Sequence, residues 1–272
     1  MPARRRRSCL SVPASSERML AKAPTLGADE VVVDLEDGVA LADKDAARAL
    51  AVAAVRNGPL GRTTAIRVNG RSTEWWEADL RAVAEARPDV VVLPKAESPE
   101  DVAATAELLP AGIGLEVLIE TASAFAAAEE IAAASDRIEA LLLGPADLAS
   151  SLGIPVLAIG DGVSDFALAR IVAAARSAGL QAIDGPHARL GDDLGLVRSA
   201  RRALEHGYDG KWVIHPSQIE PVHLVFTPSP ADVAKAERIL ATSGALRLDG
   251  ELVDEASRRL AESLLRRAEL RA

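Results

Sequence analysis

The sequence has little cysteine and few aromatic residues. Cys9 is the only cysteine among 272 residues, so no disulfide can form within the chain and a cysteine-based metal site is excluded. We expect Cys9 to be a small buried residue within a strand. Phe, Trp and Tyr together make up only 3% of the chain. The hydrophobic core must therefore be built from Ala, Val, Leu and Ile.

Positive charge is also in deficit. The chain carries 31 Lys and Arg against 40 Asp and Glu, which gives a formal net charge of −9. Broad nucleic-acid binding needs a basic surface that neutralises phosphates, so this balance argues against a nucleic-acid partner. The run Arg4–Arg7 is a local exception. It is either a solvated stretch or a patch that attracts an anionic ligand.

Long hydrophobic runs are missing as well. No segment approaches the ~20 consecutive apolar residues of a membrane span, so we expect no membrane association. The arginines near the start resemble the beginning of a signal peptide, but the SCLSVPASSER that follows is too polar to continue one. We therefore expect a cytoplasmic protein.

A repeated rhythm dominates the chain: a short apolar run, a polar turn, then an Ala-rich amphipathic stretch. Continuously apolar runs such as Val31–Val33 and Val90–Leu93 are typical of parallel strands covered on both faces. The predicted strands are SCLSVP, EVVVDLED, TTAIRVN, VVVLPKAE, LEVLIET, IEALLLGPAD, QAIDGP and KWVIHP. Strands alternating with helices eight times favour an α/β fold of the (β/α)8 TIM-barrel type, with an open doubly wound sheet as the alternative.

Helices are predicted between these strands, for example over 43–55, 73–87, 98–108 and 165–178. Ser98 and Pro99 form an N-terminal capping signal, and Gly179 forms a C-terminal one. We expect one TIM-barrel domain over 1–272, with a barrel core over 1–228 and a helical extension over 229–272. The extension has two helices, over 231–243 and 253–268. The last has little core of its own to join, so it is expected to pack on a neighbouring subunit.

Ionisable and polar residues follow the predicted strands, at the end of the barrel where TIM-barrel active sites are assembled. In chain order these residues are Glu36, Asp37, Arg67, Asn69, Lys95, Glu97, Glu120, Asp147, Asp184 and His215. No zinc-ligand spacing, nucleophile elbow or phosphate-binding loop accompanies them. The pattern predicts a polar pocket on an apolar scaffold.

Glu120 and Asp147 follow consecutive strands, so their carboxylates are expected to lie within reach of each other. Either residue could instead cap the helix that follows it. Two carboxylates that converge without a cation would repel, and one of them would take up a proton. A divalent ion resolves this conflict, and Mg²⁺ is commonly held by one or two carboxylates plus water and substrate oxygens.

Arg67 lies within a strand, where an arginine is costly to bury without an anion. A structural partner such as Glu36 or Asp37 is one explanation. The other is a substrate carboxylate, which the planar guanidinium binds through paired hydrogen bonds. Lys95 and His215 are either structural residues or supports for the site.

The ordered set of motifs resembles the HpcH/HpaI aldolase and citrate lyase beta-subunit family. The motifs that carry the resemblance are LSVPASSERMLAKA, VVVDLEDGV, KDAAR, IRVNG, LPKAES, LIETA, GPADLA, AIDGP, WVIHPSQIEPVHLVFTPS and DGELVDEASRRLAESLLRRA. They cover nearly the whole chain in the right order. The resemblance implies a TIM barrel of the phosphoenolpyruvate/pyruvate-binding type, whose last helix is exchanged between subunits of a trimer or hexamer.

The resemblance also implies roles for individual residues. Glu120 and Asp147 would hold Mg²⁺, Arg67 would bind the oxoacid or acyl carbonyl, and Asp254 would act as the acid/base from the adjacent subunit. Glu36 and Asp37 would lie at the floor of the pocket. Arg18 and Lys22 would lie near the coenzyme A (CoA) chain. As a separate electrostatic hypothesis, Arg4–Arg7 would attract the phosphates of CoA. Relatives often have a proline shortly after the catalytic aspartate, whereas Glu255 to Ser257 follow here. Asp254 could instead cap the last helix.

Three functions are consistent with these residues. The first is a Mg²⁺-dependent carbon–carbon lyase that cleaves or forms malyl-CoA, citramalyl-CoA or citryl-CoA, with a 2-oxoacid and an acyl thioester as the other partners. The second is the beta subunit of a citrate lyase complex, acting on citryl thioester on an acyl carrier protein. The third is a non-catalytic relative that binds an oxoacid or CoA.

Overall fold

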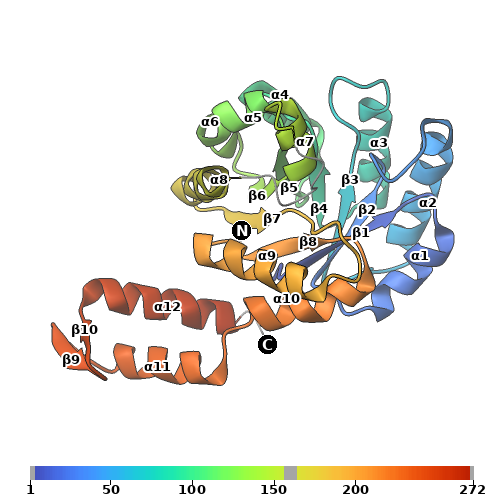
Figure 1. The fold of residues 1–272 in the computed structure, drawn as a ribbon. Coiled ribbons are helices and arrows are strands. Elements are labelled where there is room, and N and C mark those ends of the chain that lie inside the picture. Colours follow the sequence, from blue (N-terminus) through green and yellow to red (C-terminus); the bar gives the residue numbers. More distant parts are fainter. Residues whose placement is uncertain (1–3, 156–163, 270–272) are drawn as a thin grey trace.

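Eight parallel strands form a closed barrel in the order β1 to β8 in the computed structural model, which describes residues 4–155 and 164–269 (Figure 1). The strands are β1 (Ser8–Pro13), β2 (Glu30–Asp34), β3 (Thr63–Arg67), β4 (Val90–Leu93), β5 (Gly114–Ile119), β6 (Ile138–Leu143), β7 (Gln181–Asp184) and β8 (Gly210–Val213). Every predicted strand is confirmed, and the open sheet is excluded because β8 pairs with β1.

Small and branched aliphatic residues fill the barrel, as the shortage of aromatics requires. The interior cluster is Cys9, Val32, Ala65, Val90, Val92, Leu118, Ala140, Leu142, Ile183 and Trp212. Cys9 is fully buried in β1, as expected. A larger apolar layer lies between the strands and the surrounding helices. Both faces of the sheet are therefore covered, which explains why strands such as Val90–Leu93 are apolar throughout.

Helices surround the barrel. They are α1 (Glu17–Lys22), α2 (Lys44–Arg56), α3 (Trp76–Ala86), α4 (Pro99–Leu108), α5 (Ala122–Ala126), α6 (Ala128–Ala132), α7 (Pro145–Ser151), α8 (Asp165–Ser177), α9 (Asp193–His206) and α10 (Ile219–Phe226). The Ser98 hydroxyl caps α4 as predicted, and Gly179 adopts a φ of +72° after α8. The α3 helix begins at Trp76 instead of Thr73, because the Thr73 hydroxyl and N–H both bond to Gly70 in a turn.

The C-terminal residues form an arm that projects from the barrel (Figure 1). It consists of α11 (Pro230–Leu240), the antiparallel strands β9 (Leu246–Leu248) and β10 (Glu251–Val253), and α12 (Glu255–Glu269). The hairpin was not predicted, although Asp249 and Gly250 both have positive φ and Asp-Gly is a strong hairpin signal. Helix α10 was also missed, because prolines punctuate that part of the sequence. No helix of the described residues is long and apolar enough to cross a membrane.

The Arg4–Arg7 run closes the N-terminal end of the barrel, opposite the polar strand ends. The Arg6 side chain is fully buried, with its Nε 2.9 Å from Glu30 and 2.6 Å from Glu116, and it also contacts Glu139. Arg7 pairs with Asp29. The expectation of a solvated run, or of a patch that attracts CoA phosphates, is therefore wrong. These arginines form ion pairs within the chain, because charged groups buried at the end of a barrel need partners of opposite charge.

Glu116 is the carboxyl in this cluster whose proton affinity folding increases most clearly. It is fully buried beside Glu30, and both carboxylates share the guanidinium of Arg6. Burial, and then the charge of Glu30, raise the pKa of Glu116 well above its usual range. The folded state therefore binds this proton more tightly than the unfolded chain. Stability is expected to fall as pH rises from about 4.5 toward the folded pKa, by at most about 1.4 kcal/mol per pH unit.

The substitution Glu116→Gln is expected to flatten this dependence, because an amide imitates the protonated carboxyl. Urea unfolding between pH 5 and 9 should show that the stability of the wild type falls more steeply with pH than that of the variant, which still contains the raised carboxyl of Glu120. Glu77→Gln is a suitable control, because the Glu77 side chain is 73% exposed. Parallel curves for wild type and Glu116→Gln would show that Glu116 is ionised at neutral pH.

Candidate metal and substrate site

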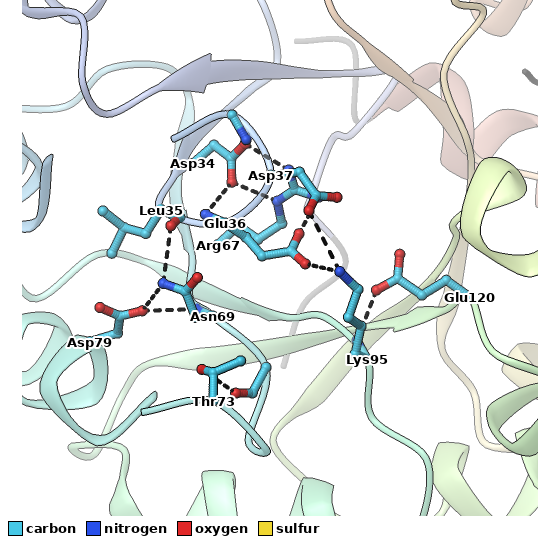
Figure 2. Close-up of polar contacts among 12 residues, drawn as sticks. Asp34, Leu35, Glu36, Asp37, Arg67, Asn69, Thr73, Asp79, Lys95 and Glu120 are labelled. Carbon is cyan, nitrogen blue, oxygen red and sulfur yellow. Dashed lines mark hydrogen bonds and ion pairs between the residues drawn. The ribbon is translucent and has the colours of Figure 1, made fainter. Parts of the chain in front are cut away.

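Side chains from several strands meet at the C-terminal end of the barrel. Arg67 ends β3, Glu36 follows β2, Lys95 follows β4 and Glu120 follows β5, and Figure 2 shows these four in one network of contacts. Asp147 lies in α7, after β6, and its charge acts on both Lys95 and Glu120. The structure thus brings together the residues predicted from the neighbouring strand ends.

Arg67 is held mainly by Asp34, a carboxylate that its sequence pattern does not mark as a partner. Its Nε and Nη2 donate to the two oxygens of Asp34 at 2.7 and 2.6 Å, and its Nη1 lies 3.0 Å from Glu36 Oε2. Glu36 is thus one predicted partner that is confirmed, whereas Asp37 instead lies 3.5 Å from Lys95 Nζ. The register of β2 and β3 places Asp34 directly beside Arg67.

Asp34 is fixed in its charged form. Burial alone would raise its pKa, but Arg67 and the backbone N–H groups of Glu36 and Gly38 lower it below the ordinary value. The guanidinium of Arg67 also lies 5.5 Å from the ring of Trp212. Arg67 is therefore oriented before any ligand arrives, and part of its donor set remains available.

Glu120 is a buried carboxylate without a cationic partner among the described residues. Its side-chain oxygen Oε1 accepts a 2.8 Å bond from the N–H of Lys95. Burial and then the charge of Glu36 raise the pKa of Glu120 to about 7. A Cβ at Gly144 would lie 2.5 Å from Glu120 Oε2, so only glycine leaves room for this carboxylate. Thr121, not Glu120, caps α5, and the capping explanation for Glu120 is wrong.

Asp147 does not cap a helix either. The N-cap of α7 is Gly144, and Asp147 lies in the first turn with no side-chain capping bond. Its carboxylate is partly exposed. Within residues 4–155 and 164–269 it forms no hydrogen bond and no ion pair of 4 Å or less. A carboxylate held at a strand end without a structural partner is available to a ligand.

The donor chemistry fits a divalent ion. Arg67 and Lys95 neutralise Asp34 and Glu36, which leaves Glu120 and Asp147 without a cation of their own in the described part of the chain. No group of three or more His, Cys, Asp or Glu in that part is arranged to hold a metal. Two carboxylates alone are nevertheless a common Mg²⁺ set, because Mg²⁺ retains waters and substrate oxygens as its other ligands.

A buried network supports the loop that carries Glu36. The Lys44 ammonium donates to the carbonyls of Leu35 and Glu36 and to Asn69 Oδ1, at 2.7 to 2.8 Å. Asn69 in turn donates to Asp79, which accepts from Arg48 (Figure 2 shows Asn69 and Asp79). Asn69 is therefore structural. Lys44 and Asp79 were missed because they lie on helices and not directly after a strand.

Three of the other strand-end residues have different roles. Asp184 forms a buried ion pair with Lys211. His215 is exposed and caps a short 3-10 turn through Ser217. The side chain of Glu97 is exposed to solvent. None of these three joins the contacts around Arg67 and Glu120.

The remaining predicted residues lie outside this network within one chain. Arg18 and Lys22 are exposed on α1, the helix that follows β1. Asp254 follows the hairpin at the outer end of the arm (Figure 1) and caps α12, accepting a 3.0 Å bond from the N–H of Ser257. That bond lowers the pKa of Asp254. The predicted capping role of Asp254 is thus confirmed. Within a single chain, Asp254 does not contact Arg67 or Glu120.

The chain is similar to several known proteins. Residues 7–216 match the HpcH/HpaI aldolase/citrate lyase family. The chain is 38% identical to L-malyl-CoA/beta-methylmalyl-CoA lyase of Rhodobacter capsulatus, over 99% of this chain and 96% of that protein. It is also 38% identical to (3S)-malyl-CoA thioesterase of Cereibacter sphaeroides, over 97% and 94%. CitE from Mycobacterium tuberculosis, in complex with magnesium, acetoacetate and coenzyme A, has a TM-score of 0.81 at 37% identity, covering 98% of this chain and 99% of that one.

Proposed function

Because the chain belongs to the HpcH/HpaI aldolase/citrate lyase family, we propose that it is a Mg²⁺-dependent carbon–carbon lyase acting on a 3-hydroxyacyl-CoA. Cleavage would yield a 2-oxoacid and an acyl-CoA, and the reverse reaction would join them. The observation that carries this proposal is the pair Glu120 and Asp147. Neither carboxylate forms an ion pair of 4 Å or less in the described part of the chain, and the charge of Arg67, which is already oriented, acts on Glu120.

The metal would be held by Glu120 and Asp147. When bound, Mg²⁺ would supply Lewis-acid polarisation of the keto and carboxylate oxygens of the oxoacid. The Glu120 carboxyl, whose pKa is about 7, must give up its proton to serve as a ligand. The 2.8 Å bond from the Lys95 N–H favours the charged form that this role requires.

Arg67 is assigned to the substrate. Asp34 accepts two hydrogen bonds from its guanidinium and Glu36 Oε2 lies 3.0 Å from its Nη1, so further N–H groups remain for an acyl carbonyl or an oxoacid oxygen. A fixed positive charge at that point stabilises the negative charge of the thioester enolate as the carbon–carbon bond breaks. The carboxylates of Glu36 and Asp37 would line the same pocket.

Asp254 is assigned as the acid/base that takes the proton of the substrate hydroxyl. It directly follows β10, and Figure 1 shows the β9–β10 hairpin at the outer end of the arm, so Asp254 would enter the barrel of an adjacent subunit in a trimer or hexamer. Residues 229–272 would then be an exchanged extension of the barrel core over 1–228. Arg18 and Lys22, both exposed on α1, would contact the CoA chain.

The test is a substrate panel. Purified protein with Mg²⁺ is expected to cleave at least one of malyl-CoA, citramalyl-CoA and citryl-CoA, and chelation of the metal should stop the reaction. Products must be identified, because a relative of equal identity is a thioesterase. Release of a 2-oxoacid with an acyl-CoA indicates a lyase, whereas free CoA with the intact hydroxyacid indicates hydrolysis.

Failure on the whole panel would contradict a free-standing lyase. Turnover of citryl thioester only on an acyl carrier protein would identify a subunit of a citrate lyase complex. Binding without any turnover would identify a non-catalytic relative.

A further inference from the structure

We propose that Lys95 is the positioning residue of the metal site, and that its main chain, held in the left-handed conformation, aims the Glu120 carboxylate. This inference rests on the function proposed above. Lys95 has a φ of +50°, and it is one of three non-glycine residues with positive φ among those the structure describes. Of the three, Arg87 ends a helix and Asp249 lies in a hairpin turn, whereas Lys95 lies at the polar end of the barrel.

The main chain of Lys95 contacts the proposed metal ligand directly. Its N–H donates to Glu120 Oε1 at 2.8 Å, while Glu120 Oε2 lies over Gly144, the residue before α7. One oxygen is therefore anchored and the other faces the helix that carries Asp147. In Figure 2, Lys95 lies between Glu120 on one side and the loop of Glu36 and Asp37 on the other.

The side chain explains why this position is not glycine. Glycine adopts positive φ without steric cost, so a lysine there indicates a use for its ammonium. The Lys95 Nζ lies 2.5 Å from Glu36 Oε1 and 3.5 Å from Asp37 Oδ1. It thereby neutralises the carboxylates that would otherwise compete with Glu120 and Asp147 for the cation.

The two roles have opposite effects on metal affinity, so they can be separated. Loss of the ammonium removes a positive charge from the surroundings of the cation and should leave binding unchanged or tighter. Loss of the left-handed conformation releases Glu120 and should weaken binding. Methionine, glycine and valine at 95 all lack the charge, but a β-branched residue such as valine is strongly disfavoured at positive φ.

The experiment measures Mn²⁺ affinity by electron paramagnetic resonance, without substrate, for wild type, Lys95→Met, Lys95→Gly and Lys95→Val. Lys95→Met and Lys95→Gly are expected to bind Mn²⁺ at least as tightly as wild type, within about threefold. Lys95→Val is expected to bind about 10- to 100-fold more weakly, the usual cost of losing a residue that orients a metal ligand. Thermal unfolding shows whether each variant is folded.

Equal Mn²⁺ affinity in folded Lys95→Val and Lys95→Met overturns the inference. A tenfold loss of Mn²⁺ affinity in Lys95→Gly also overturns the inference, because glycine keeps the backbone conformation at this position. This second comparison tests the inference if Lys95→Val does not fold. Wild-type protein that binds no Mn²⁺, or binds it no better than Asp147→Ala, overturns the proposed function itself. A merely structural Lys95 would change the unfolding temperature and leave Mn²⁺ affinity the same in all folded variants.

Discussion

The substitution Asp147→Ala is expected to abolish metal-dependent turnover while leaving the barrel folded. The Asp147 carboxylate has no hydrogen bond or ion pair to lose in the described part of the chain, and its removal leaves no buried group unpaired. The metal would keep only Glu120 as a protein ligand. Lewis-acid stabilisation by a bound metal is worth several kcal/mol, so kcat/KM should fall at least about a hundred-fold.

The measurement is steady-state cleavage across a range of Mg²⁺ concentrations, together with thermal unfolding. Glu97→Ala is the matched control, since Glu97 is an exposed acid after β4 that makes no contact with Arg67 or Glu120. The control should retain wild-type kinetics. Wild-type turnover by folded Asp147→Ala would reject the metal assignment.

The substitution Asp254→Asn is expected to lower kcat by about 10²- to 10⁴-fold, the usual contribution of a general acid or base. Asparagine can still accept the bond from the Ser257 N–H, so α12 should keep its cap. Burial of Asp254 against a second subunit would raise its pKa and make it a better base than it is in the single chain.

A mixture of subunits tests the exchange of arms. Asp147→Ala and Asp254→Asn are each expected to be inactive alone. After unfolding and joint refolding, about a quarter of the sites should combine an intact barrel from one chain with an intact arm from another, so activity should return. No recovery in mixed oligomers that are shown to form would mean that Asp254 does not act across subunits.

Local patterns in the sequence were sufficient to predict the architecture of the barrel. Apolar runs such as Val90–Leu93, which alternate with Ala-rich amphipathic stretches, predicted all eight strands. Parallel strands in a barrel present their C-terminal ends at one edge, so Arg67 and Glu120 could be assigned to a common pocket. Both signals depend on residues that are neighbours in the chain.

The sequence could not show which strand-end residues contact each other. Asp34, the main partner of Arg67, was missed because that pairing follows from the register of β2 and β3. The arginine run was assigned to solvent or ligand because its carboxylate partners lie on β2, β5 and β6, up to 135 residues away. Nor does any local signal mark the positive φ of Lys95.

Glu120 and Asp147 best illustrate the difference between what the sequence determines and what only the tertiary structure determines. The sequence determined that each carboxylate follows a strand, but each could equally have capped the next helix. Only the tertiary structure decided against capping, since Thr121 caps α5, Gly144 is the N-cap of α7 and the N–H of Lys95 holds Glu120. Hydrophobic periodicity fixes where strands lie because burial acts on every residue of a segment. The direction of a single polar side chain depends instead on a few contacts between segments that are distant in the chain, and only folding brings those together.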